Sequence, residues 1–121
     1  MTINIKGTGI SVTPEISDYL HKRLEGIDKF LPQKDGGCMV DVELGRSTNH
    51  HHTGDVCRAE INVHIGGKIF RAVSEQQDLY SAIDEIKDAL TRELASYKEK
   101  RLSLIRRSGL KLKNFIRKFY K

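Results

Sequence analysis

The stretch CRAEINVHIGGKIFRAVS, residues 57–74, predicts the fold of this chain. Gly66-Gly67 at its centre is a two-residue signal for a tight β-hairpin. Before that turn, apolar and polar side chains alternate, which is the pattern of a strand with one buried and one solvated face. The apolar positions are Ala59, Ile61, Val63 and Ile65. The stretch therefore predicts two paired strands of a sheet that is apolar on one side only.

The chain before this hairpin predicts two further strands and a helix. TINIK at 2–6 and MVDVEL at 39–44 show the same alternation. Between them, Thr13-Pro14-Glu15 is a typical helix start, with a capping hydroxyl, proline in the first turn and an acidic residue at the positive helix end. An apolar stripe then predicts one helix ending at Pro32. The stripe consists of Ile16, Leu20, Leu24, Ile27 and Leu31.

The chain after the hairpin predicts a long second helix. Asp78 is a suitable N-cap, and apolar residues then recur every three or four positions. They are Leu79, Ile83, Ile86, Leu90, Leu94 and Tyr97. The stripe fails at Arg101, and we expect Gly109 to break the helix.

The order β-α-β-β-β-α predicts an α+β fold. Each helix and the sheet has one apolar side to bury, so both helices should cover the same face of a four-stranded sheet. This two-layer sandwich is similar in outline to double-stranded-RNA-binding domains. An outline alone assigns no function.

Charge divides the chain into two unlike parts. The last 24 residues, 98–121, hold ten of the 21 Lys and Arg residues and one of the 16 acids, a net charge of +9. The preceding 97 residues carry the remaining 11 basic and 15 acidic side chains, a net charge of −4. Such a basic block is typical of a tail that binds nucleic acid or an anionic membrane surface. A solubilising or disordered end is the alternative.

The sequence indicates a cytoplasmic protein. Its N-terminus lacks the apolar segment of an export signal, and no apolar run approaches the roughly 20 residues of a membrane span. The two cysteines, Cys38 and Cys57, should lie near opposite ends of neighbouring strands, so we expect free thiols rather than a disulfide.

No motif predicts catalysis, a cofactor or a metal site. The sequence has no nucleophile elbow, P-loop or glycine-rich dinucleotide turn. His50, His51 and His52 are consecutive in the polar loop RSTNHHHTGD, and consecutive histidines on a loop do not preorganise a tetrahedral site. We therefore expect a protein that is not an enzyme and has no small-molecule substrate.

Basic residues of the second helix predict a surface that could follow phosphates. At about 100° per residue, Lys87, Lys98 and Arg101 fall within a sector of about 60°, with Arg92 further round. The alternative is an ordinary solvated face with pairs such as Asp88–Arg92. The basic tail extends this series of cations, and its aromatic residues would suit either stacking on bases or a lipid interface. Those aromatics are Phe115, Phe119 and Tyr120.

At SEQQDLYSAIDEIKDALTREL, residues 74–94, the sequence resembles the family of ribosome hibernation-promoting factors and ribosome-associated inhibitors, also labelled sigma-54 modulation proteins. The resemblance extends over roughly residues 2–101, including GTGI, TPEISDYLHKRLEGIDKF, the Gly-Gly hairpin and YKEK. It implies a non-enzymatic protein that binds RNA of the small ribosomal subunit, occupies the channel of messenger and transfer RNA, and inhibits translation in stress or stationary phase. It also implies a monomer when free.

The resemblance places RNA contacts on four residues, to which this sequence adds six more cations. The family's basic positions fall on Arg23, Arg92, Lys98 and Lys100. Their basic neighbours are Lys22, Lys29, Lys87 and Arg101, and the tail continues with Arg106 and Arg107. Gly26, Ala89 and Ser96 stand where family members often have Lys, which would reduce the affinity of the domain by itself.

We expect a ribosome-binding domain over residues 1–102 and a basic tail over 103–121. From the length we expect a short family member, without the second domain that pairs ribosomes in long ones. Two other functions stay open from the sequence. One is a regulatory protein-interaction module, in line with the family's older label. The other is membrane attachment through LKLKNFIRKFYK, which one short basic helix would support only weakly.

Overall fold

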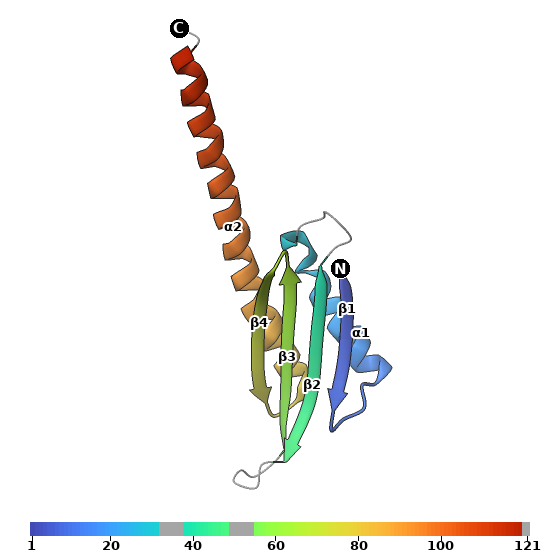
Figure 1. Cartoon of the computed structure of the whole chain (residues 1–121). Helices are drawn as coiled ribbons and strands as arrows, with labels where there is room; N and C mark the ends of the chain where they lie inside the picture. Colours follow the sequence, from blue (N-terminus) through green and yellow to red (C-terminus); the bar gives the residue numbers. More distant parts are fainter. Residues whose placement is uncertain (32–37, 49–54, 120–121) are drawn as a thin grey trace.

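The computed structural model describes residues 1–31, 38–48 and 55–119. Along the chain they form β1 (Thr2–Thr8), α1 (Pro14–Glu25), a short 3-10 helix η1 (Asp28–Phe30), β2 (Met39–Thr48), β3 (Asp55–Ile65), β4 (Lys68–Gln76) and α2 (Leu79–Phe119). The strands form one sheet, and both α-helices cover the same face of it (Figure 1). The predicted α+β sandwich of β-α-β-β-β-α order is confirmed.

The strands follow chain order across a mixed sheet, with β1 and β4 at its edges. β1 runs parallel to β2, and the other two pairs are antiparallel. The parallel pair arises because α1 crosses over the sheet between the two strands. The register aligns Ile5, Val42, Ile61 and Ala72 in one row on the helix-facing side.

The predicted hairpin joins β3 to β4. Ile65 pairs with Lys68, which leaves Gly66 and Gly67 as the two-residue connection. Their φ angles are 47° and 82°. Both values are in the left-handed region, as the twist of a two-residue hairpin requires and as glycine permits.

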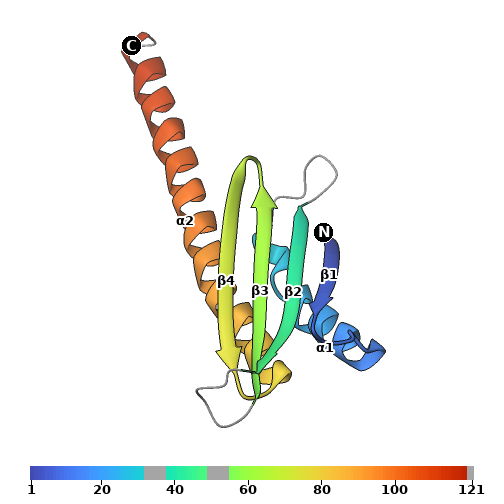
Figure 2. The ribbon, with the colours of Figure 1, turned by 60° about the horizontal axis from the view of Figure 1, so that its bottom comes forward.

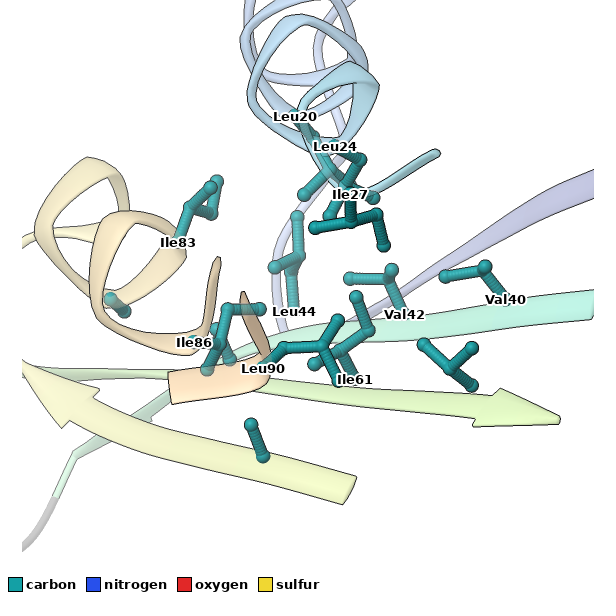
Figure 3. Close-up of a cluster of buried hydrophobic side chains, with 14 of the residues drawn as sticks. Leu20, Leu24, Ile27, Val40, Val42, Leu44, Ile61, Ile83, Ile86 and Leu90 are labelled. Atoms are coloured by element: carbon teal, nitrogen blue, oxygen red, sulfur yellow. The ribbon is translucent and has the colours of Figure 1, made fainter. Parts of the chain in front are cut away.

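The hydrophobic core lies between the sheet and the helices. In Figure 3, Leu20, Leu24 and Ile27 meet the strands from above, beside Ile83 and Ile86 of α2. All five predicted apolar positions of α2 from Leu79 to Leu94 are buried, and Tyr97 is half-buried at the end of the core. The predicted stripe of α2 is therefore confirmed.

The first helical segment differs from the single helix predicted up to Pro32. α1 ends at Glu25 with Gly26 as its C-cap, and the chain then tightens into η1. Ile27 and Leu31 are buried all the same, because a 3-10 turn keeps them over the sheet. Pro32 itself lies outside the described residues.

Both helix starts have the predicted caps. Thr13 Oγ1 accepts a hydrogen bond from the Ile16 backbone N–H at 3.2 Å. Asp78 Oδ1 accepts one from the Ser81 N–H at 2.8 Å, and the Ser81 hydroxyl donates to Asp78 Oδ2 at 2.6 Å. These hydrogen bonds lower the pKa of the Asp78 carboxyl, since they stabilise its charged form.

The prediction that Gly109 breaks the second helix is wrong. α2 continues through it to Phe119, and its 41 residues span about 60 Å. One internal glycine costs only about 1 kcal/mol relative to alanine, which the surrounding Leu, Arg and Lys residues outweigh. The C-terminal part of α2 projects past the end of the sheet (Figures 1 and 2). We call residues 101–119 the α2 extension.

The prediction that both cysteines are free thiols is confirmed. Cys38 precedes the first residue of β2, and Cys57 pairs with Arg46 near the other end of that strand. Both thiols are free and buried. The histidine loop, residues 50–52, lies outside the described residues.

We expect the core under α2 to dominate stability. Leu90 is fully buried, so Leu90→Ala should lower the free energy of unfolding by about 2–5 kcal/mol. Leu104→Ala is the matched control, because Leu104 on the α2 extension is 62% exposed and its truncation should change stability by less than about 0.5 kcal/mol. Urea unfolding midpoints at constant m-value measure both. Equal midpoints for the two variants would contradict this description of the core.

Candidate nucleic-acid interface

The ten cations predicted to contact RNA all belong to the helix layer. Lys22 and Arg23 are in α1, Lys29 is in η1, and the other seven are in α2. Within α2, Lys87 and Lys98 lie on the side that faces α1 and η1, in agreement with the sector that helical spacing gives them. Arg92 and Lys100 lie on the side that faces β4, and the others belong to the α2 extension.

Lys87 and Lys98 lie on the side of α2 that faces the end of α1 and η1. The Lys98 ammonium donates a hydrogen bond to the Lys29 carbonyl oxygen at 3.0 Å. The Lys87 side chain passes Gly26, with its Cε 3.9 Å from the position that a Cβ of residue 26 would occupy. Together with Lys29, these side chains place positive charge along the junction of η1 and α2.

Arg23 joins α1 to α2 through a carboxylate and a phenol. Its Nε is 3.0 Å from Asp84 Oδ1 and donates to the Tyr19 hydroxyl at 3.1 Å. The Tyr19 hydroxyl in turn donates to Asp84 Oδ1 at 2.5 Å. Part of the Arg23 charge is therefore neutralised within the protein, which leaves this cation less available to a polyanion than the sequence indicated.

The same three groups shift one another's pKa values. The hydrogen bond to Asp84, followed by burial, raises the pKa of the Tyr19 phenol. The hydrogen bond with Tyr19, followed by the Asp84 charge, raises the pKa of the Arg23 guanidinium. Tyr19 also packs edge-on against Tyr80, with ring centroids 4.9 Å apart. This contact network links α1 to α2 at the surface.

Arg92 and Lys100 lie on the other side of α2, where it passes over the edge strand β4. They line a groove with a volume of about 370 Å³. Sequence reasoning missed the strand's contribution to this groove, which consists of Lys68 and Phe70. The sequence signal for this contribution is the alternation of side chains along β4, which puts residues 68, 70 and 72 on the helix-facing side of the strand.

Most of the predicted cations have no carboxylate partner in the described part of the chain. The ion pairs found there among the ten are Arg23–Asp84 and Lys87–Asp88, the latter at 3.7 Å. Both pairs are substantially exposed, so each contributes little to stability. Most of the predicted cations are therefore free to meet an external anion, on a layer that also carries exposed acids such as Glu25, Asp88 and Glu93.

The α2 extension carries the remaining predicted cations. Arg101 is half-buried, with its guanidinium 5.8 Å from the centroid of the Tyr97 ring, whereas Arg106 and Arg107 are exposed. Leu102, Leu104 and Ile105 are also exposed. The aromatic residues Phe115 and Phe119 belong to the part of α2 whose side chains are not described, and Tyr120 lies beyond the described residues.

The three positions without the family's expected lysines have different surroundings. Gly26 caps α1, Ala89 is half-buried against the core, and Ser96 lines the groove beside β4. Lys87 beside Gly26, and Arg92 and Lys100 beside Ser96, supply positive charge close to two of these positions.

The open face of the sheet has a different character. Its acids are largely engaged by neighbours: Asp41 by His64 at 3.1 Å, and Glu60 by Arg71 at 2.5 Å. Within residues 1–31, 38–48 and 55–119, no cluster of His, Cys, Asp and Glu could hold a metal ion. Over the same ranges, no helix combines the length and apolarity needed to cross a bilayer.

Two known proteins similar to this chain are named as ribosome hibernation factors. A "Ribosome hibernation promotion factor" of Picosynechococcus sp. is 36% identical over 100 residues, which cover 83% of this chain and 50% of that protein. A "Ribosome hibernation promoting factor" of Klebsiella oxytoca is 28% identical over 100 residues, or 96% of its length. This chain spans about half the length of the Picosynechococcus protein that it matches.

Solved structures show the same fold. The N-terminal domain of Thermus thermophilus Protein Y matches with a TM-score of 0.67 and 32% identity, over 80% of this chain and 99% of that one. A ribosomal subunit interface protein from Coxiella burnetii matches with a TM-score of 0.65 at 20% identity, over 82% of this chain and 99% of that one.

A family model covers most of the described domain. The model for the "Sigma 54 modulation protein / S30EA ribosomal protein" family matches residues 3–102, from the first strand to the start of the α2 extension. The chain therefore belongs to the sigma 54 modulation protein / S30EA ribosomal protein family.

Proposed function

We propose that this chain is a ribosome hibernation factor that binds the small ribosomal subunit through its helix layer. Two relatives are named ribosome hibernation promotion or promoting factors. One observation carries the proposal. The part of the chain that the family model matches, residues 3–102, contains eight of the ten cations predicted to contact RNA, and all eight lie in the helix layer. The proposal places the protein in the cytoplasm, as a monomer when free.

The physical basis of binding is the neutralisation of RNA phosphates. Each Lys or Arg that meets a phosphate releases condensed counterions, and this release favours binding most at low salt. Lys22, Lys29, Arg92 and Lys100 suit this role because none has a carboxylate partner among the described residues. A rigid helix pair on a sheet would recognise a folded RNA surface by its shape rather than by its base sequence.

The proposed mechanism is occupancy. The domain would lie where messenger RNA and the A- and P-site transfer RNAs otherwise run, and translation would stop in stress or stationary phase because the channel is filled. No chemical step is involved, and the protein would need neither a cofactor nor a small-molecule substrate. The shared core holds α1 and α2 as one rigid surface, and the Arg23–Asp84–Tyr19 contacts link the two helices at its outer side.

Sucrose-gradient sedimentation of lysates tests this function. The tagged protein should sediment with small subunits or whole ribosomes from starved cells, and its share there should fall as salt is raised. A protein that stays at the top of the gradient from both growing and starved cells would contradict the proposal. Recovery of a defined protein partner without ribosomal RNA would instead support the regulatory protein-interaction function.

We also propose that the α2 extension continues along ribosomal RNA. A chain that ends after Lys100 loses eight basic residues, so it should bind small subunits more weakly and with a shallower dependence of log K on log salt. A full-length variant with Arg106→Gln and Arg107→Gln keeps the helix and removes two charges, which gives an intermediate slope. Equal affinity and slope for all three chains would contradict a role of the extension in RNA binding.

A further inference from the structure

The groove beside β4 combines aromatic rings with unpaired cations at the end of the hydrophobic core. Phe70 and Tyr97 pack edge to face, with centroids 5.0 Å apart and an angle of 64° between the rings. Both rings are half-buried, so each keeps part of its surface open to the groove. Its volume of about 370 Å³ lies within the range of about 300–1,000 Å³ of small-ligand sites.

Positive charge surrounds these rings. Lys68 Nζ is 5.8 Å from the Phe70 centroid and 5.1 Å from the Tyr97 centroid, and the Arg101 guanidinium is 5.8 Å from Tyr97. Arg92 and Lys100 line the same groove, whose one acidic lining residue is Glu93. In the described part of the chain, none of these four cations forms an ion pair with a carboxylate.

From this combination we infer that the groove binds one unpaired nucleotide of ribosomal RNA. Its base would lie against Tyr97 and Phe70, and its phosphates would lie among Lys68, Arg92 and Lys100. Aromatic faces bordered by Lys and Arg are what proteins use to hold single-stranded bases. The inference rests on the proposed function and adds to it a defined contact from β4, outside the predicted set of cations.

Charge and geometry favour RNA over an acidic peptide. A carboxylate-bearing peptide would engage the cations but would not need two partly exposed aromatic rings beside them. The groove also adjoins Arg92 and Lys100, through which the helix layer is proposed to meet phosphates. One nucleotide turned out of a folded RNA could enter the groove while its neighbours follow the helix surface.

Binding of the full-length chain to purified small subunits tests this inference. Tyr97→Leu keeps an apolar side chain at the end of the core and removes the stacking surface. It should weaken binding about ten-fold while leaving the salt slope unchanged, because no charge is lost. Lys68→Gln should weaken binding and reduce the slope by up to about one unit. Tyr97→Phe, which keeps the ring, should lose less affinity than Tyr97→Leu.

Matched controls separate the groove from general effects. Lys6→Gln removes a cation from the open sheet face and should leave affinity and slope unchanged, since Lys6 lies on the opposite side of the sheet. Thermal unfolding of each variant confirms that it is folded at the assay temperature. Ultraviolet cross-linking of the wild-type complex should yield a nucleotide adduct on the peptide containing Tyr97 or Phe70.

Three results would overturn the inference. One is wild-type affinity of Tyr97→Leu for small subunits that the wild-type chain binds well, which leaves the proposed function intact. Another is a cross-linked complex without an adduct at either ring. The third is tight binding of free AMP or UMP that Tyr97→Leu abolishes, which would assign the groove to a free nucleotide. A wild-type chain that binds no subunits contradicts the proposed function itself.

Discussion

Burial of one sheet face is the constraint on which the rest of this structure depends. The register aligns apolar residues on the same side of all four strands, and two apolar helix stripes cover them. Covering that face fixes which sides of α1 and α2 point outward. Because the predicted cations occupy those outward sides, beside acids such as Glu25, Asp88 and Glu93, the packing of the core also gathers the candidate RNA-binding residues on one layer of the molecule. Arg23, Tyr19 and Asp84 then hold the two helices together at the surface.

The end of the core has a second consequence. Leu94 is the last fully buried residue of α2, and Tyr97 is half-buried where the sheet edge is reached. There the side chains of β4 and α2 only partly cover one another, and the groove of aromatic and basic residues opens. Beyond it α2 continues without a sheet beneath it, and the residues described there, 101–109, are mostly exposed. The buried apolar stripe of α2 therefore ends, and its basic residues begin, at the place where core packing gives way to the proposed binding surface.

Sequence periodicity predicted what depends on local pattern and missed what depends on contacts between distant residues. Alternation around Ile61 and the three-to-four spacing around Leu90 identified the sheet face and the α2 stripe correctly. The same spacing did not distinguish α1 from η1, since Ile27 and Leu31 reach the core from a 3-10 turn as well as from a helix. Helix geometry placed Lys87 and Lys98 on one side of α2, where the structure has them. It could not show that Arg23 meets Asp84, 61 positions later, or that Lys100 lies beside β4. Those contacts arise from the tertiary fold.

In the proposed binding mode the helix layer faces RNA, and the open sheet face stays outside the interface. Lysine acetylation followed by mass spectrometry, on the free chain and on its complex with small subunits, distinguishes the two faces. Lys22, Lys29 and Lys100 should react more slowly in the complex, and Lys6 should react at its free rate. Protection of Lys6, with the helix-layer lysines reacting as in the free protein, would contradict this binding mode.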